Sequence, residues 1–118
     1  MEQYQFTLKI SREEIHAYSI LSGDKNPIHV DQLAAKQAGF KSIVAHGLLV
    51  QSKIISRLES LFQLEQESIQ IACTFLSPVY AEEILEIEVI STVQEIKFKG
   101  TIQLHEVVRG GIKKSERI

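Results

Sequence analysis

The stretch S-G-D-K-N-P-I-H, from Ser22 to His29, is the segment around which the rest of the sequence is organised. It places a carboxylate, Asp24, and an imidazole, His29, five positions apart where no regular helix can continue. Gly23 frees the backbone, and Pro27 disfavours the helical conformation for the residue before it. An acid and a base on an irregular loop indicate a functional site, because such groups often lie on loops that a rigid scaffold positions.

Helical signals lie on both sides of this loop. Residues 11–14 (S-R-E-E) have the form of a capping box, so a short helix is expected to begin there and to end at Ser22-Gly23. Ile15, Tyr18 and Leu21 are expected on its apolar face. Asp31 is a plausible cap for a second short helix over residues 32–38.

A long helix is predicted from about His46 to Phe62, because its apolar residues recur at helical spacing. The expected stripe is wide, as for a helix that lies against a sheet. Its members are Leu48, Leu49, Ile54, Ile55, Leu58, Leu61 and Phe62.

Alternation of apolar and polar residues predicts strands over 4–10, 68–75, 84–93 and 95–107, with a further short strand over 112–118. The pair Gly110-Gly111 is expected to form a hairpin turn between the last two. One strand, then helices, then a meander of strands indicates an α+β fold in one domain, residues 1–118, with an antiparallel sheet against the long helix.

Composition excludes several classes of function. The chain has 118 residues, 44% hydrophobic and 24% charged, with a net charge of −2 and no basic stripe, so nucleic acid is not an expected partner. No apolar run approaches the roughly 20 residues of a membrane span, and the N-terminus does not resemble a signal peptide, so a cytoplasmic protein is expected. The single cysteine, Cys73, is expected in the core, and the scattered histidines predict no metal site.

The string S-G-D-K-N-P-I-H-V-D is followed by A-H-G, whose histidine, His46, comes seventeen residues after His29. This pattern resembles the MaoC-like (R)-specific enoyl-CoA hydratases, a hot-dog-fold family, closely over residues 18–49 and more loosely elsewhere. The resemblance implies a long central helix wrapped by a curled antiparallel sheet, and a homodimer. It also implies a hydro-lyase that interconverts trans-2-enoyl and (R)-3-hydroxyacyl thioesters of CoA or acyl carrier protein, without a cofactor.

The chemistry of such a hydration matches the residue types in the motif. A water must lose a proton as it attacks the β-carbon, the α-carbon must gain one, and the thioester oxygen gains negative charge. Asp24 and His29 can serve the first two needs by holding one water between them, and the Gly47 amide can serve the third at a helix start. The resemblance implies the same three catalytic roles. It also implies that Asn26 positions the loop and the water, and that His46 shapes the turn and is a candidate contact for the thiol arm.

Two other functions stay open at this stage. A hot-dog thioesterase commonly places an acid on the central helix, where this chain offers only Glu59 and Glu65, late on that helix or beyond it. A non-catalytic acyl-thioester-binding subunit is the second alternative. Three departures from the family pattern keep it open. No Gly-Asp pair follows the F-x-x-P-V element at residues 75–79, and other residues replace, at positions 63–66, the Pro-Gly segment usual after the central helix. Ile55 stands where family members commonly have a supporting serine.

Overall fold

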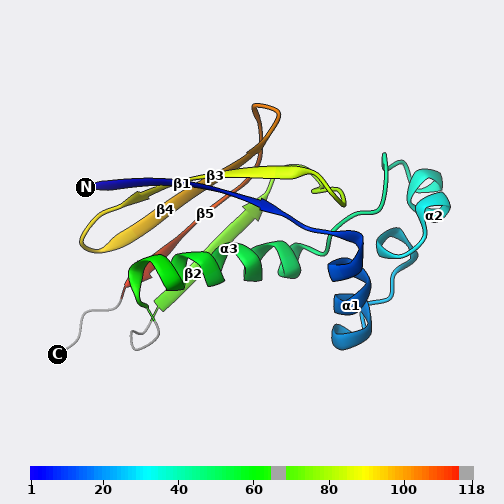
Figure 1. Ribbon diagram of the computed structural model, residues 1–118, viewed down its shortest axis with the longest axis horizontal. Coiled ribbons are helices and arrows are strands. Elements are labelled where there is room, and N and C mark those ends of the chain that lie inside the picture. Colours follow the sequence, from blue (N-terminus) through cyan, green and yellow to red (C-terminus); the bar gives the residue numbers. More distant parts are fainter. Residues whose placement is uncertain (65–68, 115–118) are drawn as a thin grey trace.

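A five-stranded antiparallel sheet, in the order β1-β3-β4-β5-β2, forms one layer of the molecule. The computed structural model describes residues 1–64 and 69–114. Helix α3 (Gly47–Phe62) lies along one face of the sheet, and α1 (Arg12–Ser22) and α2 (Gln32–Gln37) gather beyond one end of it (Figure 1). The strands are β1 (Glu2–Lys9), β2 (Ile69–Phe75), β3 (Ile84–Ser91), β4 (Glu95–Ile102) and β5 (His105–Lys114). The α+β fold and the long central helix are confirmed.

The capping signals act as the sequence predicts. The Ser11 hydroxyl accepts from the Glu14 amide while the Glu14 carboxylate accepts from the Ser11 amide, so α1 starts with a complete capping box. The helix stops at Gly23, whose φ of 79° is a left-handed conformation that glycine adopts without strain. Asp31 caps α2 by accepting from the amides of Leu33 and Ala34.

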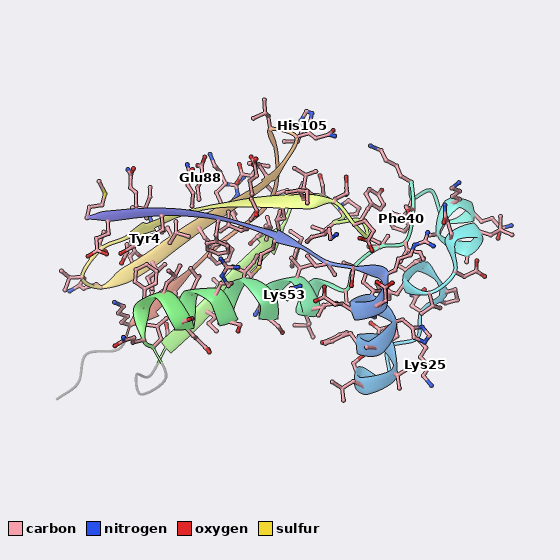
Figure 2. The ribbon with its side chains drawn as sticks, viewed as in Figure 1. Tyr4, Lys25, Phe40, Lys53, Glu88 and His105 are labelled. Atoms are coloured by element: carbon pink, nitrogen blue, oxygen red, sulfur yellow. The ribbon has the colours of Figure 1, made fainter. Side chains whose placement is uncertain are left out.

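The core lies between α3 and the facing side of the sheet. Alternate residues of β3 are buried, and Figure 2 shows the intervening Glu88 on the face of the sheet that points away from α3. Helix α3 buries a narrower stripe than expected. Leu48 and Leu61 are 66% and 42% exposed, whereas Val50, absent from the predicted stripe, is fully buried. Each residue turns the helix by about 100°, so Leu48 lies roughly 200° around the axis from Val50 and faces away from the sheet.

Helix α1 also differs from the expected pattern. Ile15 is buried and Tyr18 partly buried as predicted, but Leu21 is 86% exposed. The buried partner of Ile15, one helical turn on, is the polar residue Ser19. Helix α1 joins the core through Ile15, while Ser19 faces the segment before α3, where its hydroxyl meets the ring of His46.

The predicted hairpin turn at Gly110-Gly111 is wrong. The turn between β4 and β5 lies at Gln103 and Leu104, which have φ angles of 49° and 70°, and it projects beside His105 at the end of the sheet (Figure 2). Gly110 instead lies inside β5. A Cβ at Gly110 would fall 2.2 Å from the carbonyl oxygen of Ala72, so glycine is needed there for close approach of β2 and β5 rather than for a turn.

Smaller differences concern strand ends and Cys73. Strand β3 ends at Ser91, so Val93 is 92% exposed rather than part of the strand. The expected strand over 112–118 is the continuation of β5 to Lys114, and its last four residues lie outside the described ranges, as does Ser68. Cys73 is only partly buried because β2 is an edge strand, and this burial raises the pKa of its thiol.

Within the described ranges, no helix is both long and apolar enough to cross a membrane.

Lys53 of α3 joins three elements at the junction of the sheet and α1 (Figure 2). Its ammonium donates to the carbonyl oxygen of Lys9, at the end of β1, and to the carboxylate of Glu14. Burial raises the pKa of Glu14, but the hydrogen bonds from Lys53 and Ser11 outweigh that effect, and the pKa lies below its usual value. Glu14 is therefore ionised in the folded protein to a lower pH than in the unfolded chain.

A carboxyl group with a lowered folded pKa stabilises the fold above its unfolded pKa, and this stabilisation is lost as the pH falls through the folded pKa. We expect Glu14→Gln to lower the urea midpoint of unfolding at pH 7. The difference from the wild type should shrink as the pH falls below about 4.5. Urea titrations at neutral and acid pH test this, with the exposed neighbour Glu13→Gln as the control. A deficit of Glu14→Gln that stays constant with pH would contradict the ion pair.

Candidate active site

The loop between α1 and α2 is folded by hydrogen bonds from its own side chains. The Ser22 hydroxyl accepts from the amide of Asp24 at 3.1 Å, and the Asp24 carboxylate accepts from the amide of Asn26 at 3.3 Å. Asn26 in turn caps the short 3₁₀ helix η1 (Pro27–His29) by accepting from the amide of Ile28 at 3.2 Å. These consecutive turns bend the loop so that its acid and its base approach each other.

The carboxylate of Asp24 and the imidazole of His29 face each other across a short gap. Asp24 Oδ2 lies 3.8 Å from His29 Nε2, which is too long for a direct hydrogen bond. A single water lying beside the line that joins them, at about 2.8 Å from each atom, can bridge the two. The Asp24 side chain is 55% exposed and that of His29 is 10% exposed, so the gap is open on the side of the carboxylate.

The tautomer of His29 follows from its second nitrogen. His29 Nδ1 lies 2.6 Å from the carbonyl oxygen of Val44, which can only accept, so Nδ1 carries the proton. In the neutral ring Nε2 therefore has a free lone pair directed at the gap, as a general base requires. The amide of Val44 donates back to the carbonyl of Ile28 at 3.1 Å, which ties the loop to the segment before α3.

His46 lies behind His29 and is 3% exposed. The two rings stack with centroids 3.8 Å apart and 23° between their planes. His46 Nε2 lies 3.1 Å from the main-chain carbonyl oxygen of Asp24 and 3.1 Å from the hydroxyl of Ser19. His46 is thus buried beneath the loop, and Ser19 is a member of the cluster that the sequence prediction does not include. Its only sequence signal is a serine one helical turn after the apolar Ile15.

Gly47 is the first residue of α3 and is exposed. No hydrogen bond joins its amide to another described residue, as expected for the first turn of a helix. A Cβ at this position would lie 3.3 Å from the ring of Phe75, so the glycine leaves little space beside that ring. A cavity of about 420 Å³ borders Gly47 and Phe75, and Val44 and Phe40 also line it.

The cluster also has the composition of a metal site. Asp24, His29 and His46 each offer one ligand atom, and these atoms lie within 4.8 Å of one another. Nε2 of His46, however, is directed at the Asp24 carbonyl and the Ser19 hydroxyl, and its Nδ1 is buried. Only the carboxylate and one imidazole nitrogen therefore face the open gap, a donor set that suits a hydrogen-bonded water better than a tetrahedral metal.

The acids of the central helix lie away from this cluster. Glu59 is twelve residues along α3 from Gly47, which corresponds to about 18 Å of helix. Glu65 is outside the described ranges.

Comparison with known proteins adds evidence on ancestry. The family model described as "MaoC like domain" matches residues 2–110. The chain is 32% identical over 72 residues to the 3-hydroxyacyl-thioester dehydratase X of Mycobacterium tuberculosis. The matched segment covers 61% of this chain and 25% of that protein. It is 35% identical over 95 residues to the mitochondrial 3-hydroxyacyl-[acyl-carrier-protein] dehydratase of Arabidopsis thaliana, covering 80% of this chain and 54% of that protein. The chain thus spans about half or less of these curated relatives.

Among solved structures, an (R)-hydratase from A. caviae superposes with a TM-score of 0.79 at 20% identity, covering 95% of this chain and 93% of that one. An R-hydratase from Pseudomonas aeruginosa gives a TM-score of 0.80 at 22% identity, and the match covers 98% of this chain and 81% of that one. At this level of identity the likeness concerns the fold, which is the hot-dog arrangement that the family resemblance implies.

Proposed function

This chain belongs to the MaoC-like domain family, and from that premise we propose that it is a hydro-lyase acting on acyl thioesters. The proposed reaction is the reversible addition of water to a trans-2-enoyl thioester of CoA or acyl carrier protein, which gives the (R)-3-hydroxyacyl thioester. The observation that carries the proposal is the 3.8 Å separation of Asp24 Oδ2 and His29 Nε2, which one water lying beside the pair can bridge.

In this mechanism no covalent bond forms between the water and the protein. Its oxygen attacks the β-carbon while the Asp24–His29 pair takes one of its protons, and the pair delivers a proton to the α-carbon. His29 Nε2 is suited to accept the water proton because Nδ1 is already committed to the Val44 carbonyl. The pair gains one proton and gives one, so it ends the reaction in its starting state and needs no cofactor.

Negative charge develops on the thioester oxygen during the addition. The amide of Gly47 is exposed, lies at the positive end of α3 and borders the 420 Å³ cavity. These features support its role as a donor to that oxygen. Asn26 supports the site indirectly, since it caps η1 and so fixes the position of His29.

The thioesterase alternative has less support. It needs an acid on the central helix near the thioester, and Glu59 lies near the opposite end of α3 from Gly47. No observation in the described ranges favours it over hydration.

A homodimer is proposed as the working unit. Strand β2 is an edge of the sheet, and apolar residues on or just after it remain exposed: Ile71 at 41%, Phe75 at 37% and Leu76 at 44%. An open apolar edge favours pairing with another chain. A second copy paired along β2 would also cover Phe75 and close the cavity beside Gly47, so assembly and the site are linked.

The first prediction concerns the acid–base pair. Asp24→Asn and His29→Ala are each expected to lower the turnover of enoyl-thioester hydration by roughly 10²–10⁴-fold, because general acid–base groups contribute about that much. Since both groups hold one water, the double variant should lose little more than either single variant. Initial rates at saturating substrate and the melting temperature of each variant measure this. Near-normal turnover in either folded variant would refute the assignment.

The second prediction concerns Gly47. Gly47→Val adds a branched side chain that meets the Phe75 ring and blocks the approach to the amide. Turnover should fall by about 10²–10³-fold, the usual loss for one oxyanion donor. The melting temperature of the same soluble sample separates this effect from a change in stability. If the variant melts lower but hydrates normally, Gly47 is only a helix-start glycine.

The third prediction concerns the dimer. Ile71→Lys places a charge on the β2 edge and is expected to shift the protein from dimer to monomer at micromolar concentration. Ile90→Lys is the matched control, because Ile90 is similarly exposed, at 43%, but lies on β3, which has a neighbouring strand on both sides. Light scattering after size-exclusion chromatography gives the masses. A wild-type monomer, or a dimer that survives Ile71→Lys, would count against pairing through β2.

A further inference from the structure

A buried serine on α1 touches the candidate site from behind. Ser19 is 1% exposed, and its hydroxyl lies 3.1 Å from His46 Nε2. Through this contact α1 is joined to the residue that caps α3. Ser19 faces the interior on the same side of α1 as Ile15, where an alanine would fill the space without burying a polar group. A buried hydroxyl at this point needs a partner, and that partner is the ring of His46.

The contacts of His46 define its protonation. Nε2 also lies 3.1 Å from the main-chain carbonyl oxygen of Asp24, which can only accept, so Nε2 carries a proton shared between that oxygen and the Ser19 hydroxyl. Nδ1 is buried and has no hydrogen-bond partner among the described residues. A proton there would leave a buried donor unpaired, so the arrangement holds His46 as the neutral Nε2–H tautomer.

The ring of His46 touches both members of the proposed acid–base pair, Asp24 and His29. It donates to the main chain of Asp24 and stacks on His29 with 3.8 Å between the ring centroids. Tyr18 packs edge-on against it, with centroids 4.8 Å apart. A neutral ring in this place is compatible with a positive charge on His29 during proton transfer, whereas a second positive charge so close would oppose it.

We propose that Ser19 is a positioning residue for the reaction: its hydroxyl fixes the Nε2 edge of His46, and His46 holds the Asp24 main chain and the His29 ring at a separation that one water can bridge. The proposal rests on the proposed hydration. Ser19 does not touch substrate in this scheme. Its effect is exerted through the geometry of the acid–base pair, and displacement of such a pair by about 1 Å can cost up to about a hundredfold in rate.

Ser19→Ala tests the proposal with little risk to folding, since it removes one oxygen and leaves the Asp24 carbonyl as a partner for Nε2. We expect turnover to fall about tenfold while KM changes by less than about twofold. Ser91→Ala is the matched control, because Ser91 is also buried, at 8% exposure, but lies on β3, where its hydroxyl donates to the adjacent carbonyl of Thr92. Ser19→Thr retains the hydroxyl and should recover part of the lost turnover.

Two variants of His46 separate its two contacts. His46→Phe keeps an aromatic ring for the stack and removes the Nε2–H, whereas His46→Gln keeps an N–H donor and removes the ring. If Ser19 acts through the Nε2–H, adding Ser19→Ala to His46→Phe should cause no further loss of turnover. Full additivity in that double variant would overturn the proposal, as would unchanged turnover in Ser19→Ala.

A measurement on the unliganded protein makes the test independent of activity. Nitrogen-15 NMR of the four imidazoles, assigned with single His→Gln variants, should show His46 as the Nε2–H tautomer. The exchange of this proton with water should be faster in Ser19→Ala than in the wild type and in Ser91→Ala. If the wild type hydrates no enoyl thioester, the proposed function fails, and the NMR result alone decides the positioning: an Nδ1–H tautomer or unchanged exchange would overturn it.

Discussion

The site depends on the way the segment before α3 is held between the catalytic loop and the strands. On one side the amide of Val44 donates to Ile28, and its carbonyl accepts from the imidazole of His29. On the other side the amide of Ala45 donates to the carbonyl of Val79 at 2.8 Å. This short extended segment is therefore fixed on both edges, and it fixes the direction in which α3 starts. The loop, the helix start and the cavity beside it are positioned by one set of hydrogen bonds to the main chain of this segment.

Much of this arrangement could be predicted from the sequence because its signals are local. The capping box at Ser11, the left-handed glycine at Gly23 and the cap at Asp31 each depend on residues within one turn. Strand alternation in β3 is equally local. The family resemblance supplied what local signals could not, namely that the loop and the helix start meet in a hot-dog fold.

The features that the sequence did not predict depend on contacts distant along the chain. A glycine pair is a common turn signal, but at Gly110 it serves the close approach of β2, which no pattern within β5 reveals. The true turn uses Gln103 and Leu104, which seldom adopt positive φ. Ser19 is a further case: its partner His46 lies 27 residues away, and a lone serine on a helix carries no signal of burial.

The central claim is that Asp24 and His29 direct one water at an enoyl thioester. The most direct measurement follows the absorbance of the enoyl-thioester band of crotonyl-CoA, and of a longer enoyl-CoA, with the wild-type protein. Thiol release from the saturated acyl-CoA is measured in parallel. The account predicts loss of the enoyl band with formation of the (R)-3-hydroxyacyl thioester and no release of thiol. Thiol release with an unchanged enoyl band, or a protein that leaves both thioesters intact, would contradict it.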